Sequence, residues 1–411
     1  MDWGRRVGFS HNRTELKGRS RSAGPVGFTA GEGAPGEVVV YFGDDPRRLY
    51  QLWQWIPVLE RLHGRHPVLL VARDPRTYTE LHHRTSLPHV LAPTFADLVD
   101  LYENSAHKIA IYVNNSAHNF QSLVGRRMLH VHVNHGESDK VCMVSNQVKA
   151  YDRVFVAGEA AVRRYRAGLI DFDTGRLVRV GRPQLDLRPS PVLPPTSRRT
   201  ILYAPTWEGE NTSNNYTSVD RYGAAIVSAA LAVPDVRVVY KPHPRIAISP
   251  HPTVLAAHEQ IIRLLDDDRE HQVMTDADIF AVFPGCDLMI TDVSSVGLDF
   301  LYLHPDKPLF ITDRHDDRDR LRVEAPVSRC ADVVDSATIG MLAHTLAARL
   351  AHDEHKQGRD ATRRYYFDNL GRGESTERFL AAIDDVMTAR DRMMGQGRVA
   401  IVMDEPREQV A

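Results

Sequence analysis

The sequence predicts an α/β protein of two Rossmann-like, doubly wound domains that face one another across a cleft. Short apolar runs of strand length alternate with amphipathic stretches through the first half of the chain, and the alternation restarts in the second half. A proline-rich stretch separates the two halves. A chain of 411 residues is also too long for one ordinary core, so two domains are expected.

The first domain is predicted to cover residues 37–187. Five runs rich in Val, Ile and Leu have the length and composition of buried strands in a parallel sheet. These runs are Val38–Phe42, Val68–Val71, Ile109–Val113, Leu129–Val133 and Val154–Val156. Between the first two, apolar side chains recur at helical spacing through Arg47–Leu62, which predicts an amphipathic helix.

The second domain is predicted to cover residues 200–392, after a linker at residues 188–199. Four prolines in the linker exclude a helix or a central strand there. The predicted strands of the second domain are Thr200–Ala204, Val236–Tyr240, Leu288–Thr291 and Pro308–Ile311, with helices near 219–231, 253–265 and 337–392. Ligands of open α/β sheets bind at the carboxyl ends of the strands, so the cleft between the domains is the expected site.

The two ends of the chain are expected to lie outside these domains. Residues 1–36 are rich in Gly, Arg and Ser, which is typical of a disordered leader. A basic arm that contacts an anionic membrane surface stays open as an alternative. Residues 393–411 are expected to form a flexible tail.

The composition is that of a soluble globular protein, with 25% charged and 43% hydrophobic residues. The formal net charge of −2 gives no global basic field, so nucleic acid is not an expected partner. No apolar run approaches the ~20 residues that span a bilayer. The three cysteines form no close pair, which argues against a disulfide framework or a thiolate zinc site and fits a reducing cytoplasm.

Paired serines follow a predicted strand of the second domain. A helix is predicted to start at about Ser294, so Ser294 and Ser295 would place hydroxyls beside free backbone N–H groups. Such a helix N-terminus binds phosphate well. A serine at this position also serves as an ordinary helix cap, so both interpretations stay open.

A cationic turn follows the strand Val236–Tyr240. Lys241, His243 and Arg245 alternate with prolines, which stop a helix and stiffen the turn. An imidazolium at His243 could bind or neutralise a diphosphate, whereas an ordinary charged turn is the alternative.

Two further segments carry polar groups at the ends of strands. His130 and His132 share one side of a strand without a carboxylate or thiolate companion, so a structural role is favoured over a metal site. His135, just past that strand, is a better candidate for a general base. Thr206 and Trp207 stand at the mouth of a loop, although a lone Trp commonly covers a core edge.

Five segments in this order resemble the CDP-glycerol glycerophosphotransferase family, which includes the teichoic-acid primases and polymerases. The matching segments are His135-Gly136 with Lys140, Gly181–Asp186, Leu202–Trp207, Lys241–Pro244 and Thr291–Phe300. The resemblance covers about residues 130–380. The chain departs from the family pattern at Glu137-Ser138-Asp139, where Thr-Pro-Leu usually follows the His-Gly pair, and at Arg182-Pro183-Gln184, where the usual proline-arginine order is changed.

The resemblance implies a GT-B fold and a transfer of glycerol phosphate, or a related polyol phosphate, from CDP-glycerol to an acceptor hydroxyl. CMP would be released, and the product would belong to teichoic-acid-like cell-wall polymer synthesis. A lipid-linked acceptor and peripheral contact with the cytoplasmic face of the membrane are implied as well.

The resemblance also implies roles for individual residues. His135 would act as general base, and His243 would stabilise the donor diphosphate. The implied donor-side residues are Lys241, Arg245, Thr206, Trp207, Ser294, Ser295 and Asp299, and the implied acceptor-side residues are Gly136 and Lys140. No Asp-x-Asp pair follows a predicted strand, so donor binding without a metal or cofactor is expected.

Two alternatives to this function stay open. A GT-B glycosyltransferase that uses a nucleotide sugar would be served equally well by paired serines and a cleft histidine. A protein that keeps the fold and binds nucleotide without catalysis is the second alternative, and the changed residues after His135 keep it open.

Overall fold

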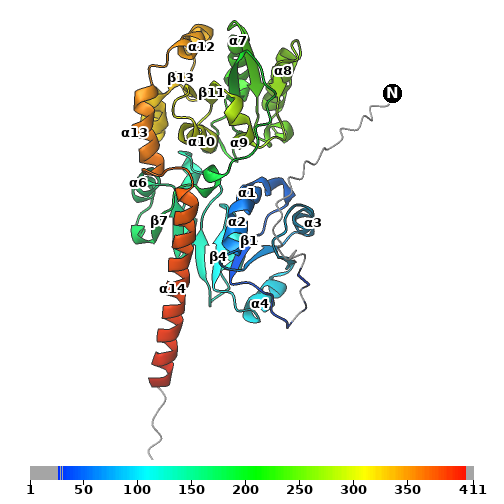
Figure 1. Cartoon of the computed structure of the whole chain (residues 1–411), viewed down its shortest axis with the longest axis vertical. Helices are drawn as coiled ribbons and strands as arrows, with labels where there is room; N and C mark the ends of the chain where they lie inside the picture. Colours follow the sequence, from blue (N-terminus) through cyan, green and yellow to red (C-terminus); the bar gives the residue numbers. More distant parts are fainter. Residues whose placement is uncertain (1–25, 28, 30, 404–411) are drawn as a thin grey trace, which may run out of the picture.

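The computed structural model describes residues 26, 27, 29 and 31–403 of the chain. The described residues form two domains, each an open sheet of parallel strands covered by helices, as the sequence predicts (Figure 1). The first sheet has seven strands in the order β3-β2-β1-β4-β5-β6-β7. They are β1 (Val38–Phe42), β2 (Val68–Ala72), β3 (His89–Leu91), β4 (Ile109–Tyr112), β5 (Leu129–His132), β6 (Arg153–Val156) and β7 (Leu177–Arg179).

Alternate side chains of the first sheet enter two separate cores, one on each face. Val38, Val40 and Phe42 pack in one core, and Val39 and Tyr41 pack in the other. Burial on both faces explains why the strands are continuous apolar runs. The helices of this domain are α1 (Tyr50–Trp53), α2 (Ile56–His63), α3 (Pro75–Arg84), α4 (Phe95–Glu103), α5 (Asn119–Ser122) and α6 (Glu159–Gly168).

The second sheet has six strands in the order β10-β9-β8-β11-β12-β13. They are β8 (Arg199–Ala204), β9 (Val236–Tyr240), β10 (Gln272–Val273), β11 (Leu288–Thr291), β12 (Leu309–Thr312) and β13 (Asp332–Val334). The helices that follow are α7 (Ala224–Leu231), α8 (Pro252–Leu265), α9 (Ile279–Val282), α10 (Ser295–Leu303), α11 (Arg318–Glu324), α12 (Leu342–Ala351), α13 (Lys356–Phe367) and α14 (Glu374–Met403).

The last helix, α14, leaves the second domain and runs along the first (Figure 1). Its apolar residues Phe379, Ile383 and Val386 are buried in the same core as Val38 and Trp55 of the first domain. The sequence assigns this segment to the second domain because helical periodicity does not show which sheet a helix covers. The boundaries of the domains as folding units stay a prediction.

The ends of the chain differ in part from the expectation. Ala34, placed by the sequence in the leader, is buried against the first domain, and its backbone N–H donates to Ser105 Oγ. Helix α14 continues past residue 392 to Met403, where the sequence places the start of a flexible tail. Residues 1–25 and 404–411, which hold most of the predicted leader and the end of the tail, lie outside the described residues.

Most local predictions agree with the elements to within a residue or two. The predicted helix at Arg47–Leu62 is divided into α1 and α2, with Pro57 in the first turn of α2. Proline fits only the first turn of a helix, so it marks a new start. The short strands β3, β7, β10 and β13 were not predicted, because two or three residues carry no readable periodicity.

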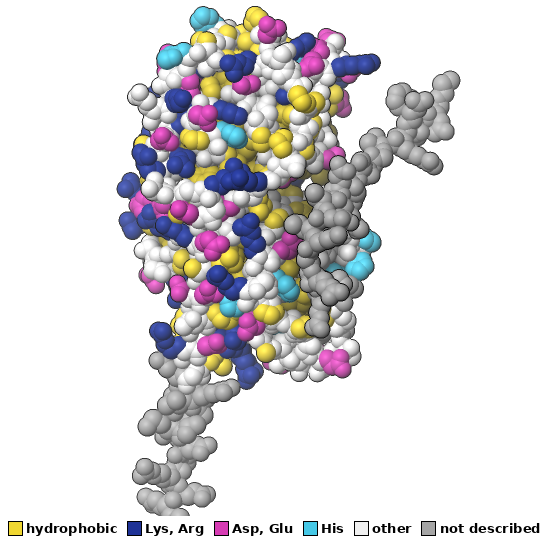
Figure 2. Space-filling model, in the orientation of Figure 1, with side chains coloured by type: hydrophobic (Ala, Val, Ile, Leu, Met, Phe, Trp, Pro, Cys, Tyr) yellow, Lys and Arg dark blue, Asp and Glu magenta, His cyan; other side chains and the backbone are white. Residues whose placement is uncertain are grey.

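Basic and acidic side chains are interspersed over the face that Figure 2 shows. Among the described residues, no helix combines the length and the apolar character that crossing a bilayer requires.

Candidate active site

The predicted acceptor-side and donor-side segments meet where the carboxyl ends of the two sheets face one another. Gly136 follows β5 in the first domain, and Ser295 begins α10 in the second. A Cβ added to Gly136 would lie 3.0 Å from the Ser295 Cβ and 2.9 Å from Arg182 Nη1. A side chain at position 136 would therefore press on Ser295 of the second domain and on the end of Arg182.

His135 and His243, the two expected catalytic residues, both lie against the ring of Tyr50. This ring from α1 stands edge-on to both imidazoles, with centroid distances of 6.0 Å to His135 and 5.5 Å to His243. His135 comes from the first domain and His243 from the second. The contact with one shared tyrosine places the two histidines in a single site between the domains.

The surroundings of both imidazoles favour their neutral form. Burial, together with the nearby Arg182 and Lys140 cations, lowers the pKa of His135 to about 3. Burial and the cations Lys140 and Lys241 likewise hold the pKa of His243 well below its usual range. The imidazolium that the sequence suggests at His243 is therefore not the state of the free protein.

A neutral His243 still offers a hydrogen-bond donor. The backbone N–H of Arg245 donates to His243 Nδ1 over 3.2 Å, so Nδ1 is the acceptor and the ring proton is on Nε2. The Nε2–H group of His243 is therefore available to an anionic oxygen. The Arg245 guanidinium stacks on the ring of Trp207, with 3.5 Å between its carbon and the ring centroid.

Lys140 crosses from the first domain to the second. Its ammonium donates to Thr206 Oγ1 over 2.7 Å. Burial lowers the pKa of Lys140 to about 8, although the negative charge of the buried Asp292 carboxylate acts in the opposite direction. A largely protonated ammonium is therefore held beside the two histidines, which makes this edge of the cleft suited to an anion.

The start of α10 has the geometry of a phosphate site. Ser294 occupies the cap position in extended conformation, but within the described part of the chain no side chain accepts a hydrogen bond from the first turn of α10. Its hydroxyl instead lies 3.4 Å from Thr291 Oγ1. The ordinary capping role is thus unfilled, and the backbone N–H groups of the first turn remain for a ligand.

Two predicted donor-binding residues have other partners. Asp299 is 1% exposed and pairs with Arg182 of the first domain, with Nε–Oδ1 at 2.8 Å and Nη2–Oδ2 at 3.0 Å. Its carboxylate therefore joins the two domains, whereas the resemblance implies a donor-side role for Asp299. Lys241 donates to the backbone carbonyl of Thr275 over 3.0 Å, so its ammonium supports the neighbouring loop.

The residues that depart from the family pattern after Gly136 form a buried charge network. Arg164 of α6 contacts Glu137 over 2.7 Å and Asp139 over 3.0 Å. Asp139 also accepts a hydrogen bond from the hydroxyl of Tyr366 on α13. The two carboxylates thus have partners within this chain, and the loop that carries His135 is fixed in place.

Comparisons with known proteins agree with this geometry. The family model described as CDP-Glycerol:Poly(glycerophosphate) glycerophosphotransferase matches residues 131–381, more than half of the chain. The chain belongs to this family. No curated protein matches the chain by sequence.

Similar solved structures show that this chain has a GT-B fold. The wall teichoic acid polymerase TagF aligns with a TM-score of 0.58 and 13% identity, over 86% of this chain and 90% of that one. A glycosyltransferase from Rickettsia africae aligns with a TM-score of 0.53 and 13% identity, over 87% of this chain and 98% of that one. Anabaena Alr3699/HepE, in complex with UDP and glucose, aligns with a TM-score of 0.53 and 12% identity, over 86% of this chain and 100% of that one.

Sequence reasoning missed two residues of this candidate site. Arg182 lies in the Gly181–Asp186 segment that carries part of the family resemblance, but its partner Asp299 becomes visible only in the fold. Tyr50 has no local signal, because it lies in an ordinary amphipathic stretch far in sequence from both histidines.

Proposed function

We propose that this protein transfers glycerol phosphate, or a closely related polyol phosphate, from CDP-glycerol to an acceptor hydroxyl and releases CMP. The observation that supports this most is the meeting of His135, His243, Lys140 and the start of α10 at one site between the domains. The description of the family names both this donor and this kind of acceptor.

The reaction would be an in-line displacement at the glycerol-linked phosphorus of the donor. The acceptor oxygen forms a new P–O bond, and the bond from that phosphorus to the bridging oxygen breaks. CMP leaves with the bridging oxygen, and the proton of the acceptor hydroxyl passes to His135. General base catalysis of this kind typically contributes about 100–10,000-fold in rate.

The low pKa of His135 keeps its imidazole neutral, as a general base requires. A neutral imidazole is the form that accepts a proton, and it predominates at neutral pH. The donor diphosphate would bring negative charge close to Arg182 and Lys140, whose cations lower that pKa in the free protein. When the donor is bound, its negative charge offsets those cations. The pKa of His135 then rises, and the imidazole becomes a stronger base.

The donor phosphates would be held by groups of the second domain and by Lys140. His243 donates from Nε2, and the first turn of α10 presents backbone N–H groups near Ser294 and Ser295. Lys140 adds an ammonium next to Thr206. Arg245, stacked on Trp207, adds a further cation at the mouth of the cleft. Fixed cationic groups of this kind neutralise the leaving group without a metal.

The acceptor in this proposal is the hydroxyl end of a lipid-linked polymer, reached by peripheral contact with the cytoplasmic face of the membrane. The family description, with its poly(glycerophosphate) acceptor, supports a polymeric acceptor.

The released nucleotide tests the proposal. Purified protein is incubated with CDP-glycerol, CDP-ribitol, UDP-glucose or GDP-mannose, together with a glycerophosphate-bearing acceptor, with and without EDTA. CMP release from a CDP-polyol, insensitive to EDTA, is the expected result. Release of UDP or GDP would assign the GT-B site to glycosyl transfer and refute the proposed donor.

A further inference from the structure

Tyr50 contacts both histidines of the site, yet the proposed reaction assigns it no role. Its ring lies edge-on to His135 at 6.0 Å and to His243 at 5.5 Å, with interplanar angles of 90° and 89°. Edge-to-face pairs at such distances are a favoured arrangement of neighbouring aromatic rings. One side chain of the first domain therefore packs against both the expected base and the expected phosphate-holding group.

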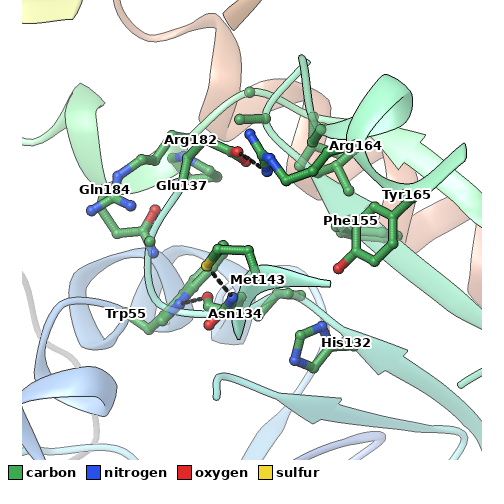
Figure 3. Close-up of a pocket in the computed structure, with 18 residues that line it drawn as sticks. Trp55, His132, Asn134, Glu137, Met143, Phe155, Arg164, Tyr165, Arg182 and Gln184 are labelled. Carbon is green, nitrogen blue, oxygen red and sulfur yellow. Dashed lines mark hydrogen bonds and ion pairs between the residues drawn. The ribbon is translucent and has the colours of Figure 1, made fainter. Parts of the chain in front are cut away.

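The main chain at His135 is held by its neighbours. Asn134 has a left-handed backbone, with φ at 54°, and its side-chain Oδ1 accepts a hydrogen bond from the His135 N–H over 2.8 Å. Trp55, directly before α2, donates from its indole to the Asn134 carbonyl over 2.6 Å (Figure 3). The segment that carries Tyr50 and Trp55 thus restrains the loop of His135 through its backbone as well as through its ring.

The imidazole of His135 lacks the hydrogen bond that commonly orients a general base. Such a base is ordinarily held by a third group, which bonds the ring nitrogen that does not accept the proton. In the described part of the chain, His135 Nδ1 is buried and has no hydrogen-bond partner. The direction of this ring therefore depends on packing, and Tyr50 supplies an aromatic contact for it.

His243 lies between one aromatic residue from each domain. Its ring is tilted against Trp207 of the second domain at a centroid distance of 6.2 Å, and it meets Tyr50 of the first domain at 5.5 Å. The Arg245 N–H bonds Nδ1 but leaves the ring free to turn about that bond. The direction of His243 relative to His135 therefore depends on the first domain.

Tyr50 is itself held by a polar network of the first domain. The Gln51 amide donates to the Tyr50 hydroxyl over 3.3 Å, and Gln51 Oε1 accepts from the side-chain amide of Asn114 over 3.0 Å. Gln51 and Asn114 are both buried. A ring that is fixed in this way can fix its neighbours in turn.

We propose that Tyr50 is a positioning residue of the transfer reaction, whose ring sets the directions of His135 and His243 relative to one another across the cleft. This inference rests on the proposed function, since these two histidines are the base and the phosphate-holding group of that reaction. The ring, rather than the hydroxyl, makes both contacts.

The test compares four variants of the full chain. Tyr50→Leu removes the ring, and Tyr50→Met does the same in case one variant fails to fold. Tyr50→Phe keeps the ring and lacks only the hydroxyl. Tyr78→Leu is the matched control, because Tyr78 is also a half-buried tyrosine of the first domain and its ring lies 5.2 Å from that of His89.

Turnover is measured as CMP release from CDP-glycerol. Folded Tyr50→Leu or Tyr50→Met should lower kcat about 100-fold, because a displacement of about 1 Å costs this much in rate. The donor KM should change much less than kcat, because Lys140 and the start of α10 also hold the donor. Tyr50→Phe should retain most of the wild-type kcat, and Tyr78→Leu should retain all of it.

Proton NMR of the imidazoles tests the contacts without any turnover. The ring current of Tyr50 displaces the resonances of protons close to it, so those of His135 and His243 should both move in Tyr50→Leu. They should stay in place in Tyr78→Leu. The variants His135→Asn and His243→Asn assign the two sets of resonances.

Equal kcat in Tyr50→Leu and Tyr78→Leu would overturn the inference, and so would a loss in Tyr50→Phe as large as that in Tyr50→Leu. Unchanged imidazole resonances in a folded variant without the ring would overturn it as well. If the wild type turns over no CDP-polyol, the proposed function fails, whereas imidazole resonances that move together still support the coupling of the two histidines through Tyr50.

Discussion

The ion pair between Arg182 and Asp299 links the two domains, and its removal is expected to be costly. Arg182 is 4% exposed and Asp299 is 1% exposed, and two short N–O contacts of 2.8 Å and 3.0 Å join them. Asp299→Asn keeps the size of the side chain and removes the charge, which leaves a buried guanidinium without a counter-charge. Breaking a buried pair in this way costs about 3–5 kcal/mol, a large part of a typical total of about 5–15 kcal/mol.

Urea unfolding followed by circular dichroism measures this cost. Asp299→Asn should lower the free energy of unfolding by about 3–5 kcal/mol. The double variant Arg182→Met/Asp299→Leu should recover most of the loss, because no unpaired charge remains. Asp267→Asn, an exposed aspartate, is the matched control and should change little. A loss below about 1 kcal/mol in Asp299→Asn, or equal loss in the single and double variants, would refute the assignment of this pair as the buried link.

Three further predictions concern the site itself. His135→Asn should lower kcat at least about 100-fold while donor affinity stays within twofold. The exposed control variant His82→Asn should have no effect. Equal kcat values in the two variants would exclude His135 as the base. The pKa of His135 is about 3 in the folded chain and about 6.5 unfolded, so the unfolded state binds more protons between these values and stability rises with pH across that window. His135→Asn should therefore reduce that rise, by up to about 1.4 kcal/mol per pH unit, in urea titrations at pH 4.5, 5.5 and 7; an unchanged slope would show that His135 titrates normally. Lys140→Met should raise the donor KM about 10–100-fold, as the loss of a charged hydrogen bond predicts, whereas the exposed Lys356→Met should not; similar KM values would place the donor elsewhere.

The fold could be read from the sequence because both sheets are parallel and covered on two faces. A strand such as Val38–Phe42 is then an uninterrupted apolar run, the strongest local signal a strand can give. The edge strand at Gln272–Val273 gives no such signal, because two half-buried residues have no periodicity. Helix α14 was recognised as a helix, but its packing on the first domain depends on contacts that no local pattern contains.

The candidate site was predictable to the extent that its residues follow strands. His135, His243 and Ser295 each come just after a strand, and parallel strands bring such residues to one edge. Pairings across the domains were not predictable. Asp299 has the spacing of a ligand-binding residue, and only the fold shows that Arg182 already occupies its carboxylate.

In the proposed reaction a polyol phosphate, and not a sugar, passes through the site of His135 and His243. Phosphorus NMR of the protein with CDP-glycerol and an acceptor tests this most directly, because it follows donor and product at once. CMP and a new phosphodiester are expected in equal amounts, with neither product above background in His135→Asn. CMP without a phosphodiester, or full activity in His135→Asn, would contradict it.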